Sequence, residues 1–225
     1  MKRILFVLLA VMMVVSLWGC TGNEDVRGQV SGNTKPAGEE TVQQTEPAVS
    51  MGKTESNVYK NDFLGISCAL SSDWVFYTDE QIRELNNFAA DAAGEEFKEA
   101  VAKANIIYDM QANNQVDYSN INVNMEKLSP LQAAALDIKK TLESQFSSIE
   151  SSLSNMGFEN IEVAYAQITV DGKVFDGIKV KAQIQGIDFF EEAISFKKGS
   201  YFANVTVAYY QADAAQSIWD CFTVS

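Results

Sequence analysis

The most constraining feature of this chain is a series of strands near its C-terminus whose apolar side chains fall on both faces. From Ile161 to Tyr210 apolar and polar residues alternate with a period of two, which predicts strands. Because neighbouring residues of a strand point to opposite faces, adjacent bulky residues make both faces apolar. Such a sheet must be covered on both sides, and we expect helices to cover it. The adjacent aromatic pairs are Phe189-Phe190, Tyr201-Phe202 and Tyr209-Tyr210.

Turn signals set the boundaries of these strands. Asp171-Gly172 is typical of a tight hairpin, and Lys197-Lys198-Gly199-Ser200 is typical of a turn. Further strands are expected earlier in the chain, where alternation is also present. The predicted strands are Leu64–Leu70, Asn105–Ala112, Tyr118–Lys127, Val174–Gln185, Ile187–Phe196 and Tyr201–Tyr210.

The longest predicted helix begins after Ser129-Pro130, an N-cap with proline at the first helical position. Apolar residues then recur at spacings of three and four from Leu131 to Met156, and Gly157 stands where the helix should stop. The spacing is also heptad-like, but a run of this length more often makes one core-facing helix than a coiled coil. Shorter helices are expected after Thr78, after Gly94 and over Ala212–Phe222.

Together these elements predict an α+β fold. We expect a mainly antiparallel sheet of about six to seven strands with helices on both faces. The elements form a single globular domain over residues 58–225.

The first 19 residues have the parts of a lipoprotein signal peptide. Lys2 and Arg3 form a positive start, and an uncharged run follows from Ile4 to Leu17. A membrane-spanning helix needs about 20 apolar residues, so the run is short for one. Leu17-Trp18-Gly19-Cys20 then resembles the lipobox read by lipoprotein signal peptidase. We expect cleavage before Cys20 and lipidation of that cysteine; ordinary secretion with Cys20 as a passive thiol is the alternative.

Residues 20–57 are predicted to be the lipidated N-terminus and a disordered linker. From Thr21 to Asn57 the chain is rich in polar residues, has no aromatic residue, and contains Pro36 and Pro47. Such a composition cannot bury enough apolar surface to offset the entropy of ordering. With the lipid, this predicts an extracytoplasmic protein anchored to the cell membrane.

Charge and composition limit the function classes. The chain has 17 Lys and Arg against 30 Asp and Glu, a net charge of −13. Because such a surface repels phosphate backbones, nucleic acid is not an expected partner. The chain has no histidine, which excludes Ser-His-Asp and Cys-His arrangements and His-ligated zinc. We predict no catalytic residue, no metal site and no cofactor.

The segment Val58–Trp74, VYKNDFLGISCALSSDW, resembles the opening of PsbP-like domains. The shared pattern is an asparagine, an aromatic residue, Gly-Ile, an alternating strand and a turn that ends in tryptophan. The later order of elements is also similar to that family, although Ser71-Ser72-Asp73 replaces its usual proline before the tryptophan. The resemblance implies an α/β/α sandwich that acts by binding to a larger assembly, and it transfers no catalytic residue.

Two cysteines in the predicted domain lie on apolar faces, Cys68 on a strand and Cys221 on the last helix. In an exported protein they either form a disulfide or remain buried thiols.

Polar residues offer two further candidate sites. Asn120, Asn122 and Asn124 share one strand face, which either binds sugars or peptides or is the solvated face of an edge strand. Carboxylates could converge for calcium binding or acid/base chemistry, as in a carboxylate-based hydrolase, or form a solvated charged face. They are Asp188, Glu191 and Glu192, and separately Asp109 and Asp117. Trp74 and Trp219 line either a pocket or the core.

Two functions remain from these observations. The first is a non-enzymatic binding or accessory module for a protein partner at the cell envelope, suggested by the anchor, the linker and the PsbP-like resemblance. The second is a small-molecule or glycan-binding lipoprotein that serves a transporter. A cavity of several hundred cubic ångströms would favour the second.

Overall fold

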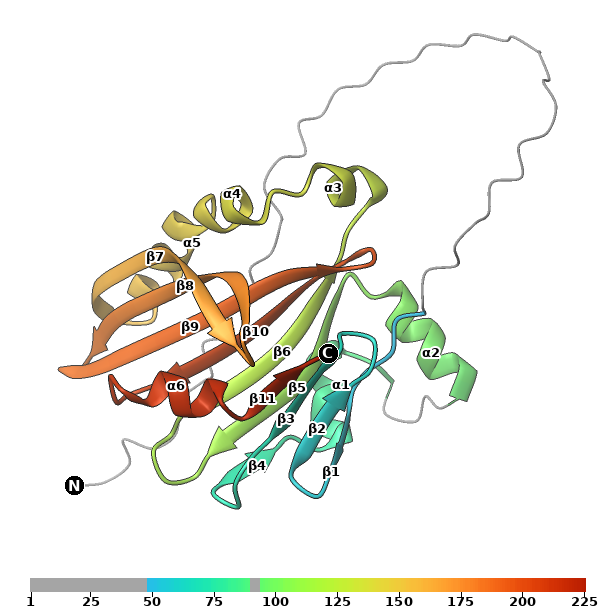
Figure 1. The fold of residues 1–225 in the computed structure, drawn as a ribbon, viewed down its shortest axis with the longest axis horizontal. Helices are drawn as coiled ribbons and strands as arrows, with labels where there is room; N and C mark the ends of the chain where they lie inside the picture. Colours follow the sequence, from blue (N-terminus) through green and yellow to red (C-terminus); the bar gives the residue numbers. More distant parts are fainter. Residues whose placement is uncertain (1–47, 90–93) are drawn as a thin grey trace, which may run out of the picture.

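The structure is a computed structural model that describes residues 48–89 and 94–225 (Figure 1). The predicted signal peptide, Cys20 and the linker up to residue 47 lie outside the described residues. The strands are β1 (Lys53–Glu55), β2 (Val58–Asn61), β3 (Ile66–Ala69), β4 (Trp74–Phe76), β5 (Ile106–Asn114), β6 (Asn120–Lys127), β7 (Phe158–Val170), β8 (Lys173–Ile184), β9 (Ile187–Lys198), β10 (Tyr201–Tyr209) and β11 (Phe222–Val224). The helices are α1 (Asp79–Asn86), α2 (Gly94–Lys103), α3 (Pro130–Ala135), α4 (Ile138–Glu143), α5 (Phe146–Asn155) and α6 (Ala214–Trp219).

The strands form two sheets. The larger has seven strands in the order β4-β5-β6-β10-β9-β8-β7, and its neighbouring strands pair antiparallel. This confirms the prediction of a mainly antiparallel sheet in an α+β fold. The smaller sheet has four strands in the order β1-β2-β3-β11, and Figure 1 shows it against the lower right part of the larger sheet.

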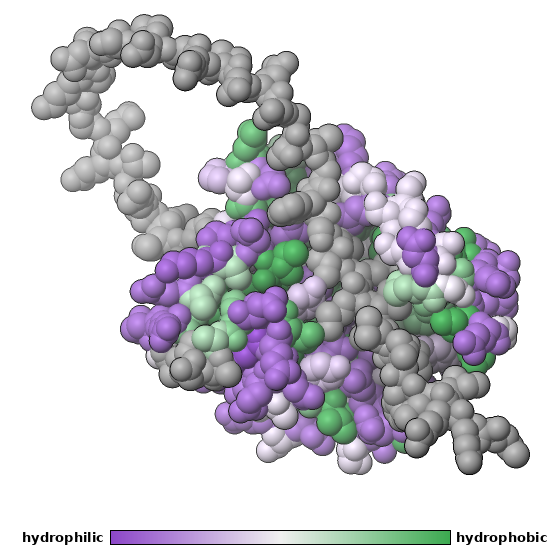
Figure 2. Space-filling view, turned by 180° about the vertical axis from the view of Figure 1, so that it is seen from behind, coloured by the Kyte–Doolittle hydropathy of each residue, from purple (hydrophilic) through white to green (hydrophobic). Residues whose placement is uncertain are grey.

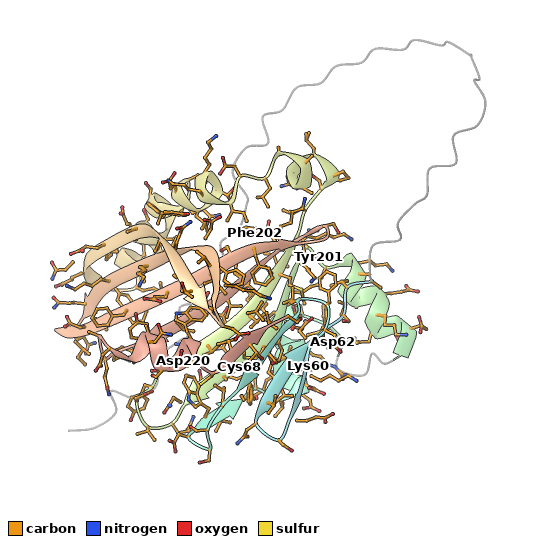
Figure 3. The ribbon with its side chains drawn as sticks, viewed as in Figure 1. Lys60, Asp62, Cys68, Tyr201, Phe202 and Asp220 are labelled. Atoms are coloured by element: carbon orange, nitrogen blue, oxygen red, sulfur yellow. The ribbon has the colours of Figure 1, made fainter. Side chains whose placement is uncertain are left out.

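Two hydrophobic cores lie on opposite faces of the larger sheet, as the aromatic pairs predicted. Tyr201 belongs to the first core and Phe202 to the second, and both are buried in the sheet (Figure 3). Phe190 and Tyr209 likewise pack in the first core, where their rings stack with centroids 5.5 Å apart. Each aromatic pair therefore divides between the two cores, which makes the sheet apolar on both faces.

Different elements cover the two faces. The first core is completed by the smaller sheet, through residues such as Tyr59 and Cys68, and by Trp219 of α6. The second core is completed by α4 and α5, through Leu142 and Leu153. On the face of the first core, the smaller sheet occupies much of the layer that the sequence predicted to be helical. Helices on both faces of the larger sheet are therefore not confirmed, and the α/β/α arrangement stays a prediction.

A buried carboxylate fastens α6 to the larger sheet. Glu192 of β9 accepts a hydrogen bond from Trp219 Nε1 at 2.8 Å and another from Tyr209 Oη at 3.3 Å. Lys179 of β8, which lies opposite Glu192 in the strand register, makes an ion pair with it at 2.7 Å. Because the carboxylate has these three partners, its burial is compensated.

The helix predicted from Ser129-Pro130 to Met156 is divided into α3, α4 and α5. The predicted start is confirmed, since Ser129 is the N-cap of α3 and forms a capping box with Gln132. The break comes at Leu136, whose backbone is extended, and Asp137, whose side chain accepts from the Lys140 amide to cap α4. Short polar side chains compete for backbone amides in this way, and the apolar spacing did not register that competition.

Both ends of the domain also differ from the prediction. The domain begins before Val58, because Lys53–Glu55 form β1 and pair with β2 inside the segment expected to be a linker. The predicted final helix over Ala212–Phe222 is shorter, and Phe222 begins β11, which pairs with β3. Cys221 consequently lies in the turn between α6 and β11 rather than on a helix.

Glu191 is a buried carboxyl group in the middle of the larger sheet. It is 1% exposed and lies between Val180 of β8 and Ala208 of β10 in the strand register. Neither of its oxygens has a hydrogen-bond partner among the described residues. Burial raises the pKa of Glu191 from its ordinary value of 4.5 to about 8. The protonated form therefore predominates in the folded protein at neutral pH.

We predict that Glu191→Gln removes a pH dependence of stability. Because the folded pKa is raised, the contribution of Glu191 is complete below pH 4.5 and is lost as pH rises through about 8. Over that window the unfolding free energy should fall by about 1.4 kcal/mol per pH unit in the native protein and stay flatter in the variant. Urea unfolding at several pH values measures the difference. Glu159→Gln, at an exposed carboxylate of β7, is the control and should leave the slope unchanged.

Candidate ligand-binding site

A cavity of about 540 Å³ is lined by residues near the start of the described chain and by α1, α2 and β5. Five parts of the chain form its walls: residues 48–52, which we call the strap, the first residues of β1, the helix α1, the helix α2, and the middle of β5. The strap and β5 are far apart in sequence, and the fold brings them together.

Much of the apolar wall of the cavity, including Val101 and Met110, belongs to the first core. Ile82 of α1, Val101 of α2 and Met110 of β5 are each less than a tenth exposed. Val49 and Met51 of the strap are half-buried and pack against the same core. Methionine side chains adapt to different shapes, so two of them suit a site that closes on an apolar ligand.

The helices at the cavity are positioned by local contacts. Thr78 and Gln81 form a capping box that starts α1, as the sequence predicted from these residues. The Arg83 guanidinium of α1 lies over the Phe97 ring of α2, 5.0 Å from its centroid, and thereby connects the two helices. Asn86 at the end of α1 bonds both the amide and the carbonyl of Tyr108 in β5. These contacts fix α1 and α2 against the edge of the larger sheet.

A buried aspartate holds the strap in place. Asp109 follows a register shift in β5, and its carboxylate accepts from the Gly52 amide at 2.8 Å and from Asn61 Nδ2 at 2.7 Å. It also accepts from the Tyr59 hydroxyl. Asn61 in turn donates to the Ser50 carbonyl of the strap at 3.2 Å. One carboxylate therefore joins the strap, the smaller sheet and the larger sheet.

Burial shifts the ionisation of this pair. The pKa of Asp109 is raised because desolvation outweighs the three hydrogen bonds that favour its charged form. The pKa of Tyr59 is raised well above its ordinary value by burial and by the neighbouring Asp109. Tyr59 thus remains a hydrogen-bond donor at any physiological pH.

Two lysines lie at the exposed side of the cavity. Lys53 of β1 and Lys98 of α2 line the cavity and are exposed, and we call this part the mouth. Lys98 pairs with Glu95 at 2.6 Å, but both side chains are largely in solvent, so that pair is weak. The acidic residues that line the cavity are Asp79 and the bonded Asp109.

The asparagine row lies on the other face of the larger sheet. β6 pairs with both β5 and β10, so the interpretation as a solvated edge strand is wrong. Asn124 Nδ2 donates to Asn122 Oδ1 at 3.1 Å, and Asn204 Nδ2 donates to Asn124 Oδ1 at 3.2 Å. Ser195 Oγ extends this chain to Asn204 at 2.6 Å, whereas Asn120 is half-buried. The amides of the row therefore bond largely to one another, and a binding role for them stays a prediction.

Gln111 lies at the cavity wall, but its side chain belongs with the asparagine row. It pairs with Asn122 in the strand register, whereas the neighbouring Met110 pairs with Val123 of the first core. Neither polar atom of the buried Gln111 amide has a partner in the described part of the chain. The cavity interior therefore presents Met110 and not the Gln111 amide.

The other predicted sites are not brought together. Glu191 and Glu192 point to opposite faces of β9 and are buried, so the interpretation as a solvated charged face is wrong for both, while Asp188 is exposed. Asp109 is buried and Asp117 is half-exposed in the turn after β5. Within residues 48–89 and 94–225 no group of three or more Cys, Asp or Glu residues is placed to hold a metal ion.

The two domain cysteines are free thiols in the structure. Cys68 is buried in β3, as Figure 3 shows, and Cys221 Sγ donates to the Ser217 carbonyl at 3.4 Å. The residue paired with Cys68 on β11 is Phe222, so Cys221 is one position away from the direct cross-strand partner. A disulfide stays a prediction for the oxidising environment. Trp74 and Trp219 belong to the first core and do not line the cavity.

Sequence reasoning found Asp109 but not its role, and it missed the strap. The available signal was an aspartate between apolar residues in the first half of a strand, and such a residue needs bonded partners when buried. The partner segment, Met51-Gly52, lies in a stretch whose composition resembles a linker, so composition concealed it. Figure 2 views the molecule from behind Figure 1, and the coloured surface there is mainly hydrophilic with separate small hydrophobic patches.

No family model matches the chain, and no curated protein matches it in sequence. The chain is similar to the solution structure of a cyanobacterial PsbP protein, CyanoP from Synechocystis sp. PCC 6803, with 11% identity, a TM-score of 0.45, and coverage of 79% of this chain and 98% of that one. It is also similar to LpqN of Mycobacterium tuberculosis, a protein involved in cell envelope biogenesis, with 10% identity, a TM-score of 0.39, and coverage of 71% and 83%. A Bacteroides thetaiotaomicron protein matches at 11% identity and a TM-score of 0.39, over 75% of this chain and 48% of that one. The first belongs to the PsbP group that Val58–Trp74 resembles, and at these levels none indicates a function for this chain.

We predict that Gly52→Ala detaches the strap. A methyl group at Gly52 would clash with Tyr59 Cε2 and with Tyr59 Cζ, at 2.9 Å, and would lie tightly against Asp109 Oδ2, at 3.0 Å. The crowding should reduce the unfolding free energy by about 1–3 kcal/mol and expose the Gly52 amide to hydrogen exchange. Ser50→Ala is the control, because Ser50 contributes its backbone carbonyl to the strap contacts and its side chain is exposed. If hydrogen exchange of the residue-52 amide were unchanged in Gly52→Ala, the proposed attachment of the strap at this position would be contradicted.

Proposed function

We propose that this protein is an exported lipoprotein whose domain binds a small molecule in the cavity between the strap, α1, α2 and β5. The observation that carries the proposal is the cavity itself. Its volume of about 540 Å³ lies within the range of roughly 300–1,000 Å³ that is usual for ligand sites. Its wall is mainly apolar, with charged groups at the mouth, as in sites that bind drug-sized molecules.

The role that we propose is binding rather than catalysis. A carboxylate-based hydrolase needs two carboxylates that act on one substrate. Asp79 and Asp109 both line the cavity, but Asp109 already accepts hydrogen bonds from Gly52, Tyr59 and Asn61. These bonds give Asp109 a structural task and support the binding role.

A protein partner at the envelope is the second candidate function. It is favoured by exposed apolar residues at one end of the larger sheet, where Val116 and Tyr118 of the β5–β6 turn are 69% and 58% exposed. Val75 of the adjacent β4 is 53% exposed and continues the same end of the sheet. A surface of this kind suits contact with another protein. We place this function second because the exposed apolar surface consists of few residues and does not enclose a cavity.

The proposed location is the outer side of the cell membrane, with the lipidated Cys20 as the anchor. The apolar leader and the lipobox-like sequence before Cys20 support it. No helix within the described ranges is long and apolar enough to cross a membrane. Delivery of the bound molecule to a transporter is part of the same proposal.

Methionine methyl NMR tests the binding function. Met51 and Met110 line the cavity, whereas Met125 is buried in the first core without lining the cavity and Met156 is exposed after α5. Titration with a panel of small molecules should shift the methyl signals of Met51 and Met110 and leave those of Met125 and Met156 in place. A panel in which every binding compound shifts only the two control methyls, or in which no compound shifts any, would refute the proposed function.

Mass spectrometry of the mature protein tests the anchor. We expect an N-terminal Cys20 that carries lipid, and Cys20→Ser should abolish both the lipid and membrane retention because acyl chains supply the binding energy. Cys221→Ser is the matched control and should remain in the membrane fraction. A mature N-terminus at any other residue, without lipid, would show that the anchor is wrong.

A further inference from the structure

We propose that the ligand of this cavity is a small amphipathic anion, with its apolar part inside and its acidic group at the mouth near Lys53 and Lys98. The inference rests on the proposed binding function and specifies the chemical class of the ligand. Two features of the cavity lead to it: the interior is apolar, and the charge at the mouth is opposite to that of the chain.

The interior favours an apolar group. The wall combines aliphatic side chains of α1 and α2 with the methionines of the strap and of β5. An apolar chain that enters this space gains about 25 cal/mol for each Å² removed from water. Both methionines can adjust to the shape of a flexible chain without a large rearrangement.

The interior does not favour a sugar. Polyols need several hydrogen-bonding groups inside the site. Of the buried polar side chains at the cavity wall, Asp109 is occupied by its three donors and Gln111 belongs to the opposite face of the sheet. A sugar would therefore lose its hydration without replacement, and the glycan alternative is less suited to this cavity.

The charge around the cavity favours an anion. The chain as a whole has 17 basic and 30 acidic residues, but the cavity lining has more cations than carboxylates. The cations are Lys53, Arg83 and Lys98, and the carboxylates are Asp79 and Asp109. Both lysines have exposed amino groups, and the weak surface pair of Lys98 with Glu95 leaves it able to exchange that partner for a ligand. In an acidic protein, such a group of cations marks the place where an anion is attracted.

Three probes with the same chain length separate the contributions of head group and tail. Decanoate has an anionic head, decanol a neutral head and decyltrimethylammonium a cationic head. In titrations of the purified protein, below the concentrations at which the probes aggregate, the Met51 and Met110 methyl signals report occupancy of the cavity. We expect decanoate to bind about tenfold more tightly than decyltrimethylammonium, with decanol between them. Acetate, which has the head without the tail, should produce no saturable shift.

Charge variants locate the head group. Lys53→Gln and Lys98→Gln should each weaken decanoate binding about two- to fivefold, because each removes one partly screened cation. The double variant should bind decanoate and decanol almost equally. The matched control is Lys60→Gln with Lys103→Gln, which changes the net charge by the same amount. Lys60 lies opposite Lys53 in the register of β1 and β2. Lys103 is on α2 and forms an exposed ion pair with Glu99. Neither control lysine lines the cavity.

The outcomes distinguish this inference from the proposed function. Equal weakening by the control pair would assign the effect to the overall field and overturn the inference. Preference for decanol or for the cationic probe, with Met51 and Met110 still shifted, would overturn the anionic class while the cavity remained a binding site. If decanoate did not shift the Met51 and Met110 signals but another compound from the panel did, the anionic class would again be overturned and the cavity would remain a binding site. Failure of every compound at both methyls would refute the inference and the proposed function together.

Discussion

The arrangement of this domain depends on one buried carboxylate. Asp109 accepts hydrogen bonds from the strap, through the Gly52 amide, and from the smaller sheet, through Tyr59 and Asn61. The register shift in β5 is what places Asp109 there, because regular alternation would not put Asp109 and Met110 together toward the first core. Desolvation of the carboxylate is costly, and its three donors are what make that burial tolerable. Without them, the strap would lose its bond to the larger sheet. The smaller sheet would keep its polar contacts at β11, where the Val224 amide donates to Asp171 Oδ2 at 2.9 Å and the Val224 carbonyl accepts from Lys173 Nζ at 2.7 Å.

The apolar character of both sheet faces explains the unusual polar residues within it. A strand that must be covered on both sides has no solvated face on which to place charge, so its polar residues either find partners or lose their charge. Glu192 takes the first course, through Trp219, Tyr209 and Lys179. Glu191 takes the second, since burial without a described partner keeps it protonated near neutral pH. Two adjacent glutamates thus show opposite solutions to the same constraint.

Local chemistry made much of the fold predictable. Period-two alternation and the turn at Asp171-Gly172 predicted the strands β8, β9 and β10, and the paired aromatics predicted two cores. The prediction of one long helix was wrong because apolar spacing is insensitive to a side chain such as Asp137, which caps a new helix after the extended Leu136. The smaller sheet was not predicted because its strands are three or four residues long and some pair residues that are far apart in sequence. Ser67 and Thr223, for example, are 156 positions apart. No local pattern encodes such a pairing.

The same limit applied to the candidate site. Asp109, Val101 and Met51 are each ordinary in their own segment, and they become a cavity only when the strap crosses the edge of β5. The strap is continuous with the segment that precedes the domain, so one wall of the cavity is the portion of the domain nearest the proposed tether. A ligand that contacts Met51 or Val49 stabilises the docked strap by the free energy of that contact, and a docked strap binds the ligand more tightly by the same amount. Under the proposed function, retention of the strap at Asp109 and occupancy of the cavity are therefore linked quantities.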